Sequence, residues 1–188
     1  MKILLLAGTY EARIIAKVID KNLKYSLISS LAGITKNPIK ISKKMRCGGF
    51  GGQSGLAKFI SENNIYCIID ATHPFATKIS YNAKTVCNQL DIPYLLCERP
   101  PWIKATKDKW FEIDNENQLK PYLSDGDLIF VASGRQSVAY FKSHKNIKLI
   151  CRQIDDPELP FPHNNGSYLI GRPPFSLESE ICLLYTSD

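Results

Sequence analysis

A carboxylate, a hydroxyl and an imidazole lie close together in the sequence at Asp70, Thr72 and His73. They follow a short apolar run, Tyr66 to Ile69, which predicts a buried strand ending at Asp70. Open α/β sheets bind ligands at the carboxyl ends of their strands, so this group of side chains is well placed for chemistry. His73 can donate a proton or orient a carboxylate, and its alternative role is to cap the following helix. The candidate catalytic residues are therefore His73 and Asp70.

The glycine-rich loop from Gly48 to Gly52 is the second candidate ligand site. Four glycines around Phe50 lose much conformational entropy on ordering and contribute little to a core. Such a loop is tolerated where the backbone must approach or cover a ligand, and the alternative is a floppy surface loop. It is not a P-loop, because no G-K-[ST] follows.

The turn at Gly8 and Thr9 follows the first apolar run, Lys2 to Ala7. Gly8 lets the backbone approach a ligand, and a helix capped by Thr9 would direct free N–H groups at a phosphate, which the helix dipole favours by roughly 0.3–1 kcal/mol. The dinucleotide fingerprint G-x-G-x-x-G is absent. The alternative is a glycine that serves only a tight turn.

The end of the second predicted strand carries Ser29 and Ser30, where dinucleotide-binding folds usually place an acid for the ribose 2′-hydroxyl. An acid would repel a 2′-phosphate, so its absence favours NADP(H). Lys36 or Arg46 would supply the compensating cation.

The elements that must position these residues alternate between strand and helix. The apolar spacing predicts strands at 2–7, 25–29, 66–69 and 94–97, and helices from Thr9, around 56–60 and over 75–90, where Pro74 is a candidate for the first helical residue. This alternation predicts an α/β protein with a parallel sheet covered by helices on both faces.

The stretch Arg99-Pro100-Pro101-Trp102 interrupts this alternation and predicts a passage between two lobes. We expect residues 1–98 to form a Rossmann-like cofactor-binding lobe and residues 99–188 a second, incomplete α/β lobe. In the second lobe we expect strands at 110–113, 128–132 and 147–151, helices at 115–123, after Gly134 and at 177–184, and a loop over 155–174.

Composition excludes several classes of protein. The apolar content of 44% and the charged content of 22% are those of a globular chain. No stretch approaches the roughly 18–20 apolar residues of a membrane span, so a cytoplasmic protein is expected. The net charge of +6 has no long basic run behind it, which indicates a solvated lysine surface rather than nucleic-acid binding. The six cysteines form no C-x-x-C pair, so we expect buried, reduced thiols and no metal.

Taken together, these segments resemble the precorrin-6A reductase family of cobalamin biosynthesis. The matching stretches are Leu5 to Arg13, Ser30 to Gly33, Arg46 to Gly52, Asp70 to Ala76, Arg99 to Trp102 and Gly171 to Phe175. The G-G-F-G-G and D-A-T-H-P-F-A stretches are the most specific.

The resemblance implies two Rossmann-like lobes with a nicotinamide dinucleotide in the cleft between them. It also implies hydride transfer to a double bond of the precorrin macrocycle, a tetrapyrrole, with His73 or water as the proton donor. The implied cofactor-binding residues are Gly8, Thr9, Glu11, Ala12, Ser30, Gly33, Arg46, Gly48, Gly49, Phe50, Gly51, Gly52, Ala71 and Thr72. The substrate's carboxylates would meet Arg99, Arg135, Arg152 and Arg172, and its ring would stack on Phe75 or Trp102.

Two departures from the family pattern matter. Ile34 stands where family members often carry Arg, so the cofactor is NADPH or NADH. The resemblance fades near Glu180, and Cys182 to Asp188 look foreign, so we expect a C-terminally truncated second lobe with low stability and poor activity. The alternatives are another nicotinamide-dependent reductase of a small molecule, or a non-catalytic dinucleotide-binding fragment. A cobalt-containing and a metal-free substrate both remain open, as does the oligomeric state.

Overall fold

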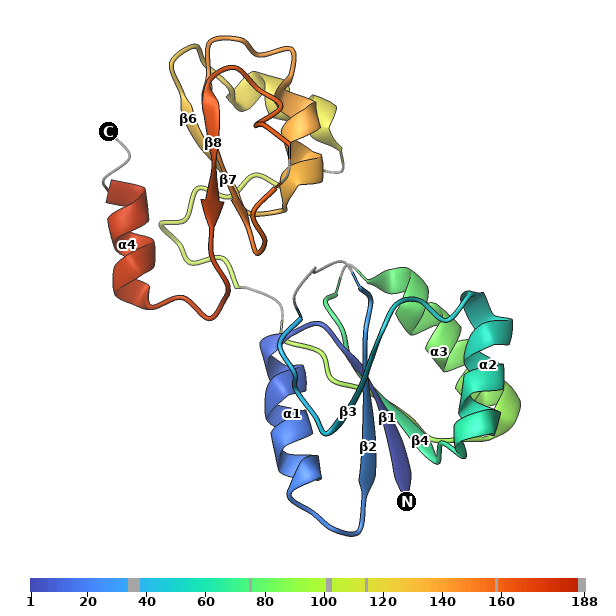
Figure 1. Ribbon diagram of the computed structural model, residues 1–188. Helices are drawn as coiled ribbons and strands as arrows, with labels where there is room; N and C mark the ends of the chain where they lie inside the picture. Colours follow the sequence, from blue (N-terminus) through green and yellow to red (C-terminus); the bar gives the residue numbers. More distant parts are fainter. Residues whose placement is uncertain (34–37, 75, 101–102, 114, 158, 186–188) are drawn as a thin grey trace. The chain divides into compact units, whose positions relative to one another are not determined.

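The computed structural model describes residues 1–33, 38–74, 76–100, 103–113, 115–157 and 159–185 (Figure 1). The chain divides into two compact units, Met1–Pro101 and Trp102–Asp188, here called unit 1 and unit 2. The boundary predicted from the sequence, between residues 98 and 99, lies slightly earlier in the same proline-containing passage.

Unit 1 contains a parallel sheet of five strands in the order β3-β2-β1-β4-β5. The strands are β1 (Lys2–Ala7), β2 (Ser26–Leu31), β3 (Lys44–Cys47), β4 (Cys67–Ala71) and β5 (Tyr94–Leu96). The chain adds β2 and β3 on one side of β1 and then β4 and β5 on the other, so the strand order reverses between β1 and β4. This is the order of the dinucleotide-binding Rossmann sheet, and the reversal marks the edge where such sheets bind ligands.

Three helices cover the two faces of this sheet (Figure 1). On one face α1 (Tyr10–Asp20) lies alone, and on the other lie α2 (Gly52–Asn63) and α3 (Thr77–Leu90). Alternate residues of β1 enter the two resulting cores, because successive side chains of a strand point to opposite faces. The α1 core contains Ile3, Leu5, Ala12 and Ala16. The α2–α3 core contains Leu4, Leu6, Leu56, Ile60 and Val86.

Unit 2 contains three parallel strands in the order β6-β7-β8. They are β6 (Leu128–Val131), β7 (Lys148–Gln153) and β8 (Gly166–Ile170). Two 3-10 helices, η1 (Glu116–Tyr122) and η2 (Arg135–Phe141), and the helix α4 (Leu177–Tyr185) complete the unit. Its buried core includes Val131, Val138, Phe141, Ile147, Leu149 and Cys151.

The expected α/β class with parallel sheets is confirmed, but several elements differ from the prediction. The loop predicted over 155–174 contains β8, and β3 was not predicted. The segment 110–113 forms no strand, and the helices predicted at 115–123 and after Gly134 are 3-10 helices. Helix α3 begins at Thr77 rather than at Pro74, with Ala76 as its N-cap.

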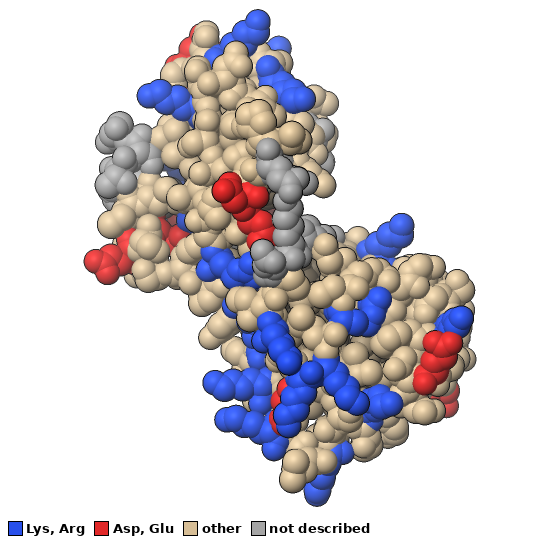
Figure 2. All heavy atoms as spheres, viewed as in Figure 1, with Lys and Arg blue, Asp and Glu red and all other residues tan. Residues whose placement is uncertain are grey.

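Many lysines of the chain are exposed to solvent. Figure 2 shows Lys and Arg side chains gathered on the visible face of unit 1. Lys17, Lys21, Lys24 and Lys43 are all exposed, which agrees with a solvated lysine surface. Within the described ranges, no helix is both long and apolar enough to cross a membrane.

None of the six cysteines forms a disulfide bond within the described part of the chain, and they do not share one environment. Cys67, Cys87 and Cys151 are buried, and burial raises the pKa of each of these thiols. The expectation of burial is wrong for Cys47 and Cys182, which are exposed.

Candidate functional site

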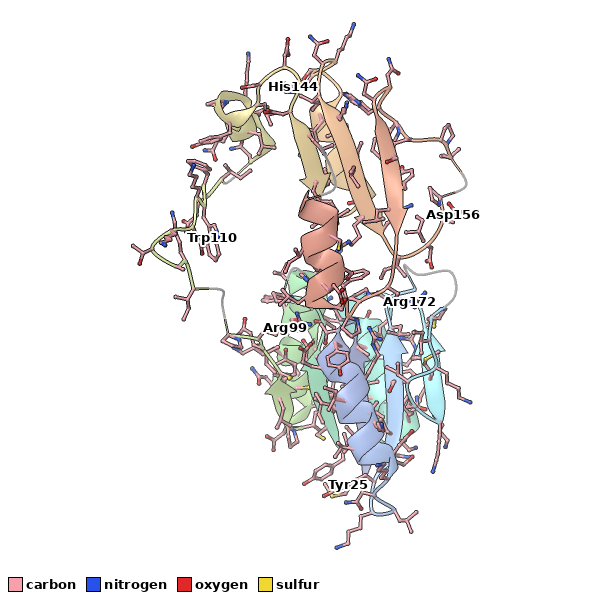
Figure 3. All side chains as sticks on the ribbon, turned by 90° about the vertical axis from the view of Figure 1, so that its left-hand side faces the viewer. Tyr25, Arg99, Trp110, His144, Asp156 and Arg172 are labelled. Carbon is pink, nitrogen blue, oxygen red and sulfur yellow. The ribbon has the colours of Figure 1, made fainter. Side chains whose placement is uncertain are left out.

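A pocket of about 240 Å³ lies at the carboxyl ends of β1, β4 and β5. It is lined by residues at or just after the ends of these strands, by Glu11 of α1 and by two residues of α3. The full lining is Thr9, Glu11, Thr72, His73, Pro74, Thr77, Ser80, Leu96, Cys97, Glu98 and Arg99. In Figure 3, Tyr25 and Arg99 mark the two opposite ends of the unit 1 sheet, and the pocket is at the Arg99 end. This is the edge where the strand order reverses, so the pocket occupies the expected ligand position of the fold.

Thr9 forms the β1 side of the pocket and is held at both of its hydrogen-bonding positions. Its side-chain oxygen accepts from the Ala12 N–H (3.3 Å), which confirms Thr9 as the N-cap of α1, and its hydroxyl donates to the Ala71 carbonyl (2.8 Å). The hydroxyl therefore ties the end of β1 to the end of β4.

The neighbouring Gly8 is exposed, and its φ lies outside the left-handed region. A Cβ at Gly8 would meet nothing nearer than 3.9 Å, so the turn itself does not require glycine here. The backbone at Gly8 is open to a ligand.

Asp70 lies beneath the pocket rather than at its surface. Its side chain is fully buried at 0% exposure. One carboxylate oxygen accepts from the N–H (3.0 Å) and the hydroxyl (2.7 Å) of Thr72, and the other accepts from the Tyr94 hydroxyl (2.8 Å). Burial, and then the hydrogen bond to Asp70, raise the pKa of Tyr94. The Asp70 carboxylate, predicted to be catalytic, is therefore enclosed beneath the pocket with both oxygens hydrogen-bonded within the protein.

His73 lies at the pocket surface and is exposed. Its carbonyl accepts from the Ala76 N–H (2.8 Å), which forms the turn between β4 and α3. The alternative role of helix cap is wrong, since Ala76 is the N-cap of α3. His73 is thus an exposed residue of the pocket lining.

Glu11 and Arg99 pair within the same pocket. The Arg99 guanidinium donates to the Glu11 carboxylate (2.7 Å), and this hydrogen bond lowers the pKa of Glu11. Arg99 was expected to meet a substrate carboxylate, but here it already has an acidic partner.

Arg46 holds the glycine-rich loop, which joins β3 to α2. Its guanidinium donates to the Ser30 hydroxyl (2.7 Å) and to the carbonyls of Gly48 (2.8 Å) and Gly49 (2.9 Å). Its central carbon lies 4.0 Å from the centroid of the Phe50 ring. Partial burial lowers the pKa of Arg46. The loop is therefore built around an internal cation rather than left floppy.

Several glycines in this region are required by the backbone. Gly48, Gly51 and Gly52 have φ values of 107°, 80° and 86°, which other residues rarely adopt. Gly33 has a φ of 82°, and a Cβ there would lie 3.2 Å from the Gly48 nitrogen, so the loops after β2 and β3 touch. Arg46, Ser30 and these glycines are absent from the lining of the pocket beside Thr72, so they form a second group at the same end of the sheet.

Gly55 is a residue that the sequence analysis missed. A Cβ at this position in α2 would lie 1.7 Å from the Phe50 carbonyl oxygen, so only glycine fits. The spacing Gly52-x-x-Gly55 is the signal that could have identified it.

In unit 2 two of the arginines expected at the substrate, Arg152 and Arg172, pair with acids of the chain. Both terminal nitrogens of Arg152 donate hydrogen bonds to the Glu180 carboxylate (2.9 and 2.7 Å). The central carbon of its guanidinium lies 4.0 Å from the centroid of the Phe175 ring. Arg172 lies 3.4 Å from Asp155. In Figure 3, His144 and Arg172 mark opposite ends of this sheet.

The remaining residues predicted at the site are only partly described. Arg135 begins η2. Ile34, Lys36, Phe75 and Trp102 lie outside the described residues.

Comparison with known proteins places this fold in a family. The family model described as precorrin-6x reductase CbiJ/CobK matches residues 2–187. The expectation that the resemblance ends near Glu180 is therefore wrong. The bidentate pair between Arg152 and Glu180 also joins α4 to β7 within unit 2.

Relatives and a solved structure agree with the family model. The precorrin-6A reductase of Sinorhizobium sp is 34% identical over 184 residues, covering 97% of this chain and 70% of that protein. The precorrin-6A reductase of Rhodococcus erythropolis is 34% identical over 186 residues, covering 97% and 74%. The cobalt-precorrin-6A reductase of Methanococcus maripaludis is 29% identical over 162 residues, covering 82% and 59%. The solved structure of a CobK precorrin-6A reductase matches with a TM-score of 0.89 and 31% identity, over 98% of this chain and 74% of that one. This chain is therefore a member of the precorrin-6x reductase CbiJ/CobK family.

Proposed function

We propose that this chain reduces a double bond of the precorrin-6A macrocycle in cobalamin biosynthesis, with NADPH as the hydride source. Family membership supports an oxidoreductase acting on a CH–CH group. A family of reductases implies a nicotinamide cofactor in general. The observation that carries the proposal for this chain is the hydroxyl-lined pocket at the reversal point of the unit 1 sheet.

The residues of this pocket, together with Gly8 beside it, fit a nicotinamide dinucleotide. Gly8 leaves its backbone open next to the first turn of α1, where a diphosphate gains from free N–H groups and the helix dipole. The hydroxyls of Thr72, Thr77 and Ser80 can both donate and accept, as the carboxamide of nicotinamide requires. Leu96 and Pro74 add apolar surface for the ring.

The end of β2 favours NADPH over NADH. Ser29 and Ser30 are buried there, where NAD-specific folds carry an acid. The Arg46 guanidinium lies 2.7 Å from the Ser30 hydroxyl, and this cation at the end of β2 supports recognition of a 2′-phosphate. Its hydrogen bonds to Ser30, Gly48 and Gly49 leave donor capacity on the guanidinium for a 2′-phosphate.

The chain's own contribution is positioning and a proton. The bound reduced nicotinamide supplies the hydride. His73 donates the proton to the neighbouring carbon of the macrocycle, since it is the exposed imidazole of the pocket. Water is the competing donor.

An anaerobic turnover assay tests the proposed reaction. The chain is mixed with precorrin-6A and either NADPH or NADH, while nicotinamide absorbance and product mass are followed. We expect oxidation of NADPH that depends on precorrin-6A, with a product two hydrogens heavier. Nucleotide binding without tetrapyrrole-dependent oxidation would instead favour a small-molecule reductase or a non-catalytic fragment. A parallel assay with cobalt-precorrin-6A separates the two substrate forms.

Replacing His73 tests the proton donor. We expect His73→Gln to lower kcat by about 100-fold while leaving the dissociation constant of NADPH within about threefold. The dissociation constant is measured from nicotinamide fluorescence. A kcat within about twofold of the original would assign the proton to water.

A further inference from the structure

One buried carboxylate lies against the pocket without reaching it. Asp70 occupies the carboxyl-terminal end of β4, opposite Leu6 of β1 and Leu96 of β5 in the sheet register. Its side chain is fully buried, and no ion pair to it occurs in the described part of the chain. A buried charge without a cation is costly unless hydrogen bonds compensate it. Ile68, two residues earlier on the same face of β4, and Ala71, the next residue, are buried and apolar, so the core itself gains nothing from a carboxylate here.

The hydrogen bonds of Asp70 show what it holds. One oxygen accepts both the N–H and the hydroxyl of Thr72, the first pocket residue after β4. The other oxygen accepts from Tyr94, a residue of the core, at 2.8 Å. The Thr72 hydroxyl also lies 3.4 Å from the hydroxyl of Ser80, another pocket residue. A continuous network thus runs from the core to the pocket surface.

The backbone at the same position joins the remaining sides of the pocket. The Asp70 carbonyl accepts from the Cys97 N–H (2.7 Å), and the Ala71 carbonyl accepts from the Thr9 hydroxyl (2.8 Å). Thr9, Thr72 and Cys97 follow β1, β4 and β5 respectively, and all three line the pocket. The end of β4 therefore fixes three sides of the pocket relative to one another.

We propose that Asp70, supported by Tyr94, is a positioning residue for the reduction: it fixes Thr72, and with it His73, at the nicotinamide pocket from the core side. The proposal rests on the proposed function for its catalytic consequence. The role requires hydrogen-bond acceptors of the right shape and does not require a negative charge. Since the Thr72 N–H is one of the bonded donors, protection of this amide from exchange reports the positioning directly.

The role separates two substitutions of Asp70. In Asp70→Asn the carboxamide oxygen can still accept both Thr72 donors, while its NH2 donates to the Tyr94 hydroxyl. Asp70→Ala removes every acceptor. A catalytic or purely electrostatic role would make the two variants equally damaging.

The experiment measures amide hydrogen exchange and turnover in the full chain carrying Asp70→Asn, Asp70→Ala, Tyr94→Phe or the control Ile68→Val. Ile68→Val perturbs the same buried strand without touching the network. We expect Asp70→Ala and Tyr94→Phe to lower the protection of the Thr72 amide and kcat by about tenfold or more, with the NADPH dissociation constant within about threefold. Asp70→Asn should stay within about threefold in all three measurements. Ile68→Val should lower the melting temperature alone.

The two proposals fail in different ways. Absence of turnover in the unsubstituted chain contradicts the proposed function, and Thr72 amide exchange still decides whether the network holds the turn. Unchanged Thr72 protection in Tyr94→Phe, or a loss in Asp70→Asn as large as in Asp70→Ala, overturns the positioning role. If Asp70→Ala does not fold, Tyr94→Phe and Asp70→Asn carry the test.

Discussion

Two loops of unit 1 are held by charges of opposite sign. The turn after β4 is held by the fully buried carboxylate of Asp70, which accepts hydrogen bonds from Thr72 and Tyr94. The glycine-rich loop after β3 is held by the half-buried guanidinium of Arg46, which donates to the Gly48 and Gly49 carbonyls. Both loops lie at the carboxyl ends of parallel strands in the same sheet.

The difference lies in what each charge contributes. The partners of Asp70 are neutral donors, so acceptor geometry decides its role. Arg46 reaches a hydroxyl and two carbonyls with one planar fork and also lies over the Phe50 ring. No other side chain combines these contacts, since a lysine ammonium is a point charge without a planar face. We therefore expect the turn after β4 to keep its structure when Asp70 is replaced by a neutral acceptor. We expect the glycine-rich loop to lose stability when Arg46 is replaced by another cation.

Removing the close contact between the glycine-rich loop and α2 should have the largest effect. In Gly55→Val the new side chain would overlap the Phe50 carbonyl, because a Cβ alone would already lie 1.7 Å from its oxygen. We expect the free energy of unfolding to fall by about 3 kcal/mol, measured by urea denaturation. Gly49→Ala is the control, since its Cβ would meet nothing within 4 Å and its φ is not positive. If Gly49→Ala lowered the free energy of unfolding as much as Gly55→Val, the loss would come from any substitution in the loop and not from the contact between Gly55 and Phe50.

The comparison between the two charges is tested directly by two conservative substitutions. Arg46→Lys keeps the charge but loses the fork, and we expect a loss of about 1.5–2 kcal/mol in the free energy of unfolding. Asp70→Asn should cost less, about 1 kcal/mol or below. Urea denaturation of both variants at neutral pH measures the difference. Equal losses would contradict the view that acceptor geometry holds one loop and a planar cation the other.

Much of unit 1 could be predicted from the sequence because its signals are local. The apolar run of β1 is buried on both faces. Thr9 caps α1 by accepting a hydrogen bond from the N–H of Ala12, only three residues later in the sequence. The strand β3 could not be predicted, because Lys44–Cys47 is half-exposed at a sheet edge and has no apolar run. The strand β8 was missed because its three apolar residues, 168–170, lie within a stretch rich in Pro, Gly and Asn. Local propensity is weak where a strand is fixed mainly by its neighbour.

The site was predicted in part for the same reason. His73 and Thr72 follow a strand, so their place in the pocket follows from the fold rule for parallel sheets. The separation of Asp70 from His73 depends on the register that brings Tyr94 beside β4, which links residues 24 positions apart. The bond from Arg46 to Ser30 likewise depends on the pairing of β2 with β3. Such contacts are set by tertiary structure and leave no local pattern.

The buried end of the Asp70 network predicts a pH dependence of stability. The pKa of Tyr94 is raised by burial and by Asp70, whereas an unfolded tyrosine loses its proton near about pH 10. The protonated Tyr94 hydroxyl therefore stabilises the folded state fully below about pH 10, and this contribution is lost as the pH rises toward the pKa of Tyr94 in the folded state. Between about pH 9 and pH 11 the chain should lose about 1 kcal/mol more stability than Tyr94→Phe, measured by urea denaturation. Tyr81→Phe, at a residue 67% exposed, should leave the decline unchanged.

The ion pair between Glu11 and Arg99 should show the smallest effect, because both side chains are partly exposed and water screens their attraction. The hydrogen bond from Arg99 lowers the pKa of Glu11 below its usual 4.5. Its contribution is thus present above about pH 4.5 and is lost as the pH falls through the lower pKa of the folded state. We expect Glu11→Gln to reduce the free energy of unfolding by about 0.5 kcal/mol or less at neutral pH and low salt, and to have no effect in about 1 M salt. Urea denaturation at both salt concentrations measures this. If the free energy of unfolding fell by more than about 1.5 kcal/mol at both salt concentrations, the pair would behave as a buried interaction, like the Asp70 network, and not as a surface ion pair.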